Sequence, residues 1–275
     1  VPCQFLGRIS NDMFGCRLID HLHDNSVGTD MVLRTDDSTT LSFVQKQSDG
    51  QARYGFFANN TADRNWSHKE MNFITLPEEA KIIHFGSISL SLEPGGTIIS
   101  DFLQKINNNL MLSFDPNIRP SLVPDRDKYI RRFQKLCKIT SVIKLSDEDL
   151  EWIFPDLTSD EAIEQLLKSG ISLIALTTGK TGAWLINETN RVLSPIYDLP
   201  VSDTIGAGDT FHGALLSYLH KKDWLDRKTL KNLNKAQLLE IGDYANIAAG
   251  INCNRSGANP PTSSEMEDAL GKLHL

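Results

Sequence analysis

The sequence predicts an α/β fold in which a mostly parallel sheet is flanked by helices on both faces. Short apolar runs that end in small or polar residues alternate with segments whose apolar residues recur at helical spacing. Turns that contain glycine join several of these segments. One β-hairpin pattern stands outside this alternation. The 275 residues fit one large α/β domain, or a domain with a small appendage.

Composition and charge exclude several classes of protein. The net charge is −7 and no basic cluster is present, so we expect no nucleic-acid partner. The four cysteines and seven histidines lack metal-ligand spacing, which favours a reduced intracellular protein. No signal-peptide pattern is found, and no apolar run is long enough to cross a bilayer. We therefore expect a cytoplasmic protein that contacts no membrane.

The first 30 residues predict a strand, a loop and a helix. Residues 1–7 are expected to be the strand, and residues 7–15 form the loop, which has a glycine at each end. Phe14, Leu18 and Leu22 then follow at helical spacing. Because the sequence begins inside a strand and lacks an initiator methionine, we expect that an N-terminal segment is missing from it.

The β-hairpin is expected at residues 38–58. Leu41, Phe43 and the aromatic run 54–57 lie in β-type segments, and Ser48-Asp49-Gly50 is the turn between them. The hairpin either forms a small sheet of its own or extends the main sheet at one edge. The polar segment 59–64 follows. Its asparagine and aspartate side chains suit a ligand with several hydroxyl groups, and they equally suit a surface turn.

The middle of the chain predicts strands that end in polar loops. Apolar runs at 82–87, 111–114, 142–145 and 174–178 are the expected strands, and residues 97–110 are an expected helix. The carboxyl ends of parallel strands open into a ligand crevice, so the residues that follow these runs are candidates for a site.

Two of these loops carry charged residues with two interpretations each. Arg119, in Asp115-Pro116-Asn117-Ile118-Arg119, has the donor fork that neutralises a phosphoryl group, or it pairs with Asp115 to hold the loop. Ser146 and Asp149 follow the next strand. Asp149 could hold a metal-bound water, or the two residues form a capping box at the start of a helix.

The most informative stretch is residues 202–214. Gly206-Ala207-Gly208 leads directly into a helix whose apolar stripe includes Phe211 and Leu215. The free amides and the dipole of a helix N-terminus bind anions, and glycine allows a phosphate to approach the backbone. Asp209 would repel such an anion. It therefore acts as a base that takes a proton from an attacking hydroxyl, or it merely caps the helix.

Four motifs resemble those of the ribokinase-like carbohydrate kinases, in particular the fructokinase branch. They are Gly-x-x-x-x-Asp-x-Phe-Gly at 7–15, Asp-x-Asn-x-Arg at 115–119, Thr-x-Gly-x-x-Gly at 177–182 and Asp-Thr-x-Gly-Ala-Gly-Asp at 203–209. The likeness extends from residue 5 to residue 261. Two departures are found: the first strand with its Gly-Gly-x-x-x-Asn segment is absent, and Ser146 and Asp149 replace the Asn-x-x-Glu of many relatives.

The resemblance implies an ATP-dependent kinase that phosphorylates a primary hydroxyl of a sugar, with fructose expected. The implied domain comprises residues 1–35 and 65–275, with residues 36–64 as a β lid that forms a homodimer contact. Alternatives are a 2-keto-3-deoxygluconate kinase and a non-catalytic sugar-binding regulator. ATP and Mg²⁺, with K⁺ as an optional ion, are the implied cofactors.

The resemblance also implies a role for each site residue. Asp209 is the base, the amides of Gly206, Ala207 and Gly208 stabilise the γ-phosphoryl oxygens, and Arg119 adds positive charge. The implied nucleotide-binding residues are Thr177, Gly179, Gly182, Asn246, Ser146 and Gly257. The implied sugar-binding residues are Asn117, Asp115, Thr61, Asp63 and Phe57. Asp149 would bind the metal through water, and Asp203 would bind the monovalent cation.

Overall fold

The computed structural model describes residues 1–46, 52–106, 110–196 and 199–273, and these residues form two compact units. The first unit comprises residues 1–78, 87–106 and 119–132. The second comprises residues 79–86, 107–118 and 133–275. Within the described part of the chain, no helix is both long and apolar enough to span a membrane.

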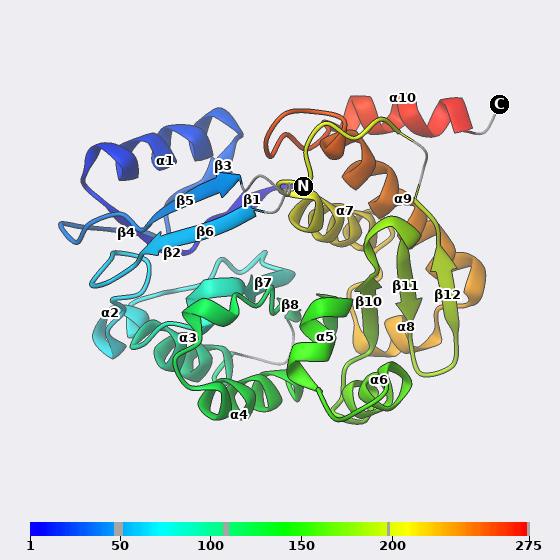
Figure 1. Ribbon diagram of the computed structural model, residues 1–275, viewed down its shortest axis with the longest axis horizontal. Coiled ribbons are helices and arrows are strands. Elements are labelled where there is room, and N and C mark those ends of the chain that lie inside the picture. The colour runs from blue at the N-terminus through cyan, green and yellow to red at the C-terminus, as the bar shows by residue number, and fades with distance from the viewer. Residues whose placement is uncertain (47–51, 107–109, 197–198, 274–275) are drawn as a thin grey trace. The chain divides into compact units, whose positions relative to one another are not determined.

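The second unit is built on a six-stranded sheet in the order β12-β11-β10-β9-β8-β7 (Figure 1). The strands are β7 (Ile82–Gly86), β8 (Met111–Asp115), β9 (Val142–Ser146), β10 (Leu173–Thr177), β11 (Ala183–Ile186) and β12 (Arg191–Ser194). Strands β7 to β10 run parallel, while β11 and β12 are added antiparallel at one edge. The prediction of a mostly parallel sheet is confirmed.

Alternation along the strands sends side chains to helices on both faces. Val142 and Leu173 lie in one core cluster with Phe211 and Leu215 of α7 (Ala207–Lys221), and this cluster extends to α8 (Arg227–Asn232) and α9 (Lys235–Cys253). On the other face, Phe114 contacts Phe133 near the end of α4 (Arg126–Cys137). The helices α5 (Asp147–Ile153) and α6 (Ser159–Lys168) contact β9 and β10, and α10 (Ser263–Leu273) packs on α9.

The first unit contains short strands and the predicted hairpin. The parallel pairs are β1 (Cys3–Gln4) with β3 (Val27–Gly28), and β2 (Gly7–Ser10) with β4 (Val32–Thr35). The antiparallel hairpin pairs β5 (Leu41–Lys46) with β6 (Ala52–Phe57), which confirms it as a two-stranded sheet of its own. Its expected turn at Ser48-Asp49-Gly50 lies outside the described residues. The helices are α1 (Met13–Asp24), α2 (His68–Asn72) and α3 (Gly95–Leu103), and the short 3₁₀ turns are at Ser87–Leu90 and Pro120–Leu122.

The start of the chain corrects one prediction. Residues 1–7 were expected to be a strand and residues 7–15 a loop, whereas the second strand is Gly7–Ser10, paired with β4. This strand was not recognised from the sequence because two of its four residues, Arg8 and Ser10, are polar. Both are nevertheless buried, as is Ile9 between them. The expected helix at 97–110 begins earlier, at Gly95, and ends at Leu103.

Candidate functional site

The glycine turn before α7 leaves the first backbone amides of the helix without a side-chain cap. Gly206 is the N-cap residue, with φ of +75°, and a Cβ there would lie 2.8 Å from the Cβ of Ala258. Asp209 is the third residue of α7 and is exposed to solvent. Because Asp209 is not the N-cap, the helix-cap interpretation of this residue is wrong.

Asp203 fixes the shape of this turn. One carboxylate oxygen accepts from the amide of Ile205 at 3.0 Å, and the other accepts from the amide of Gly257 at 3.0 Å. Asn252 adds a second link, since its side chain donates to the carbonyl of Ile205 at 2.8 Å. The structure thus brings Asp203 and Gly257 together beside the glycine turn.

A buried ion pair lies against the first turn of α7. Lys144 on β9 and Asp115 on β8 are joined by a 3.0 Å contact, and both side chains are almost fully buried. A Cβ placed on Gly208 would lie 2.9 Å from the Lys144 ammonium nitrogen. Lys144 was not predicted as a site residue from the sequence. The alternation along β9 puts Lys144 on the same face as Val142, which packs toward α7.

Two histidines extend this cluster. Ser113 Oγ lies 2.7 Å from His212 Nε2 and 3.2 Å from His84 Nδ1. Burial is the main cause that lowers the pKa of both rings, to about 3 for His84, so both are neutral at pH 7. Burial alone would raise the pKa of Asp115, but His212 and Lys144 favour its charged form and hold that pKa below its ordinary value.

The loops after β8 and β9 are joined through Asp149. Ser146 and Asp149 form the capping box of α5, and Asp149 also accepts a 2.8 Å hydrogen bond from the amide of Ile118. The preceding residue, Asn117, has a left-handed backbone with φ of +37°. The capping-box interpretation of Ser146 and Asp149 is therefore confirmed. Asn117 immediately precedes Ile118, whose amide Asp149 binds. Arg119, two residues after Asn117, lies at the start of the 3₁₀ turn Pro120–Leu122, in the first unit.

The predicted nucleotide loop is a tight turn between β10 and β11. Gly179 and Gly182 both have positive φ, at +54° and +114°, and a Cβ on Gly182 would collide with the carbonyl oxygen of Ser194. Thr177 ends β10, and its hydroxyl donates to the carbonyl of Leu145 at 3.4 Å. Asn246 is buried on α9, where its amide donates to the carbonyl of Ser194 at 2.9 Å. Its side chain therefore joins α9 to β12.

A pocket of about 310 Å³ lies within the first unit. Its polar lining comprises Arg8, Ser10, Thr39, Thr40, Ser42 and Asp63. Asp63 was predicted from the sequence, whereas Thr39, Thr40 and Ser42 were missed. Their only signal was a run of hydroxyl residues just before and within the first hairpin strand.

The other residues predicted beside the sugar take different positions in this unit. Thr61 is buried with its hydroxyl 2.6 Å from that of Thr40, and the Thr40 hydroxyl donates to the Asp63 carboxylate. Phe57 is 65% exposed and lies edge-on against Phe43, while its neighbour Phe56 lines the pocket. Of the three residues predicted beside the sugar in this unit, Thr61, Asp63 and Phe57, Asp63 is the one that lines the pocket.

Asp12 connects the pocket to α1. Its carboxylate caps the helix by accepting from the amides of Phe14 and Gly15, and it also accepts from the hydroxyl of Thr39 at 2.7 Å. The Thr39 hydroxyl is the main cause that holds the pKa of Asp12 well below its usual range. Asp12 is thus a carboxylate that stays ionised and positions Thr39 at the pocket wall.

Comparison with known proteins identifies the class of this chain. Residues 1–265 match the pfkB family of carbohydrate kinases, so the chain belongs to that family. A fructokinase of Rhizobium leguminosarum bv. trifolii is 30% identical over 86% of this chain and 72% of its own length. The crystal structure of a Xylella fastidiosa fructokinase with bound ATP has a TM-score of 0.88 at 24% identity, covering 99% of this chain and 86% of the other.

A second solved structure has the same fold. The Vibrio cholerae O395 fructokinase in its form bound to fructose, ADP and calcium ion has a TM-score of 0.81 at 22% identity, over 98% of this chain and 85% of the other. The prediction of a ribokinase-like fold is confirmed. Family membership makes the protein an ATP-dependent carbohydrate kinase, which confirms the predicted enzyme class.

Proposed function

We propose that this kinase is a fructokinase, which transfers the γ-phosphoryl group of ATP to a primary hydroxyl of fructose. The observation that carries the proposal is the uncapped turn Gly206–Gly208, followed by the exposed carboxylate of Asp209. The fructokinase name of the relative at 30% identity supports the choice of sugar.

In this proposal Asp209 removes the proton of the attacking hydroxyl. The amides of Gly206, Ala207 and Gly208 stabilise charge on the γ-phosphoryl oxygens in a loose transition state. The buried ammonium of Lys144 beside Gly208 adds positive potential under the same turn. Arg119 supplies a further positive charge toward the transferring group.

Magnesium is assigned to the phosphates of ATP rather than to a protein cage. Among the described residues, no three His, Cys, Asp or Glu side chains are grouped to hold a metal ion. Both carboxylate oxygens of Asp149 already accept backbone amides, so this residue fits a metal-bound water better than the metal itself. Mg²⁺ would neutralise phosphate charge as ATP reacts.

The loops around α7 would hold the rest of the nucleotide. We assign Thr177, Gly179 and Gly182 to one side of it, with Ser146, Asn246 and Gly257 as further contacts. The positive φ values of both glycines and of Gly257 support close approach of backbone to ligand. The paired loops at Asp203 and Gly257 are the proposed site for K⁺.

The sugar is assigned to the pocket of the first unit. Asp63, backed by Thr61 and Thr40, offers acceptors for sugar hydroxyls, and we assign Asn117, Asp115 and Phe57 to the sugar as further contacts. Arg8 is the cation in the described pocket lining, and it is already paired with Asp37 and Glu70. A carboxylate on the substrate would therefore meet Asp63 without an uncommitted cation, which favours a neutral sugar over 2-keto-3-deoxygluconate.

Fructose is expected to be the better substrate of the two, with a kcat/KM higher by about tenfold or more. The measurement compares both sugars in an assay for ATP-dependent ADP formation, with the product identified by mass spectrometry. A preference for the acid sugar would contradict the assignment of the pocket. A folded protein that binds fructose and phosphorylates no sugar in a wider panel would instead support the non-catalytic regulator, against which the intact Asp209 turn argues.

We further propose that residues 36–64 form the lid over the sugar and a contact between two copies of the chain. The support is the hairpin itself, on which Phe43 and Phe57 are 58% and 65% exposed with ring centroids 5.6 Å apart. An exposed aromatic pair on a two-stranded sheet is a surface that another copy could cover.

A further inference from the structure

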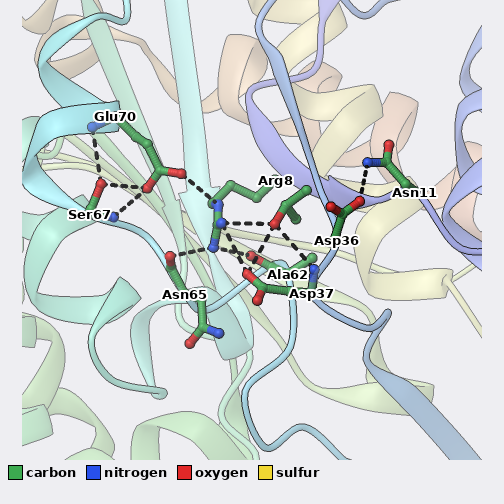
Figure 2. A network of polar contacts seen from close by, with 9 residues as sticks. Arg8, Asn11, Asp36, Asp37, Ala62, Asn65, Ser67 and Glu70 are labelled. Carbon is green, nitrogen blue, oxygen red and sulfur yellow. Dashed lines mark hydrogen bonds and ion pairs between the residues drawn. The ribbon is translucent and has the colours of Figure 1, made fainter.

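One buried arginine holds the pocket segment of the first unit in place. Figure 2 shows Arg8 between Glu70 on one side and Asp37 on the other. The side chain of Arg8 is 7% exposed, and its guanidinium lies 3.0 Å from the Asp37 carboxylate and 3.3 Å from that of Glu70. The charge of this arginine is therefore satisfied by protein carboxylates, and its other donors reach the Thr35 hydroxyl and the backbone.

Those donors go to the segment that carries Asp63. The same terminal nitrogen of Arg8 donates to the carbonyl of Ala62 at 3.2 Å and to the carbonyl of Asn65 (Figure 2). Ala62 and Asn65 flank the stretch that presents the Asp63 carboxylate to the pocket. Arg8 thus holds the backbone on both sides of Asp63 through one nitrogen of its rigid, planar guanidinium.

The rest of the segment has anchors that do not involve Arg8. The amide of Ala62 donates to the carbonyl of Ser38 at 2.9 Å, and Arg64 joins the carbonyls of Ala58 and Glu93. Loss of Arg8 therefore would not release the whole segment. It would remove the hydrogen bonds to the carbonyls of Ala62 and Asn65 and leave the Asp37 and Glu70 carboxylates without their shared cation.

We propose that Arg8 is a positioning residue for the sugar site: through the carbonyls of Ala62 and Asn65 it sets the direction of the Asp63 carboxylate. This inference rests on the proposed function, because it takes the pocket to be the sugar site. Arg8 lies in the first unit, whereas the proposed nucleotide loops belong to the second. Its effect should therefore fall on sugar binding and spare ATP binding.

The test uses Arg8→Lys in the full chain, because lysine keeps the charge and loses the planar fork. KM for fructose is expected to rise about tenfold or more, while KM for ATP stays within about twofold. The thermal shift caused by fructose in the absence of ATP should shrink in parallel. Arg131→Gln removes a charge from an exposed position in the first part of α4, which belongs to the first unit, and should leave both KM values unchanged.

A purely structural role of Arg8 predicts a different pattern, with a lower Tm or less active protein and unchanged KM for fructose. That result with Arg8→Lys would overturn the inference. If Arg8→Lys does not fold, Asp37→Asn, which loosens the same guanidinium, must raise KM for fructose in the same selective way, or the inference fails. A wild-type protein that phosphorylates no sugar would remove the proposed function instead, whatever the variants do.

Discussion

Asp209→Asn is expected to lower kcat by about 10²–10⁴-fold while the Kd for ATP stays level or decreases. Asparagine keeps the shape of the side chain and removes the negative charge and the basicity. It cannot take the proton of the attacking hydroxyl, and it no longer repels the γ-phosphate. Because Gly206 is the N-cap of α7 and Asp209 is exposed, the substitution should leave the fold intact.

The measurement is turnover of the purified, folded variant at saturating sugar and ATP, with Kd for ATP determined separately. Asp223→Asn is a matched control, since this exposed aspartate lies just beyond the opposite end of α7. It should leave kcat unchanged. Turnover of Asp209→Asn close to that of the wild type would exclude Asp209 as the base.

Lys144→Met is expected to lower the free energy of unfolding at pH 7 by about 3–5 kcal/mol, because it leaves the Asp115 carboxylate buried without its cation. His212 is neutral at that pH and cannot replace the lost charge. The double variant with Asp115→Asn should recover part of the loss, since neither residue of this pair then carries a buried charge. Denaturant unfolding at a fixed pH measures all three proteins.

Lys168→Met is the matched control for this substitution. Lys168 pairs with Glu164 one turn away on α6, where both side chains are exposed, so its loss should cost about 1 kcal/mol or less. If Lys144→Met and Lys168→Met lowered the free energy of unfolding equally, the claim that the buried Lys144–Asp115 pair stabilises the fold more than an exposed pair would be wrong.

The same ion pair has a defined pH dependence. The pKa of Asp115 is lowered in the folded protein, so its stabilising contribution is present at neutral pH and is lost as the pH falls through that lowered value. In Lys144→Met only His212 still offsets the burial of Asp115, so the pKa of Asp115 rises. The penalty of the variant should therefore shrink as the pH is lowered and Asp115 becomes protonated.

The elements with strong periodicity were predictable from the sequence. Strands β7 to β10 are short apolar runs, and α7 begins at the change from glycine turn to apolar stripe. The motif at 203–209 located the turn and Asp209, because these features are local in the sequence. Their geometry depends on neighbouring residues of one turn and needs no long-range contact.

The buried polar residues were not predictable in the same way. Arg8, Lys144 and His212 have the residue types of a solvated surface, and only distant partners explain their burial. Lys144 pairs with a residue 29 positions away, and Ser113 meets His212 across 99 positions. For the same reason β2 was taken for a loop, since the partners that bury Arg8 lie up to 62 residues further along the chain.

A crystal structure with fructose and a non-hydrolysable ATP analogue would locate the terminal phosphate and the reacting hydroxyl relative to Asp209. We expect the γ-phosphate against the amides of Gly206, Ala207 and Gly208, with the Asp209 carboxylate within hydrogen-bond distance of a primary hydroxyl of the sugar. A complex whose terminal phosphate lies away from this turn, with no anion at the N-terminus of α7, would contradict it.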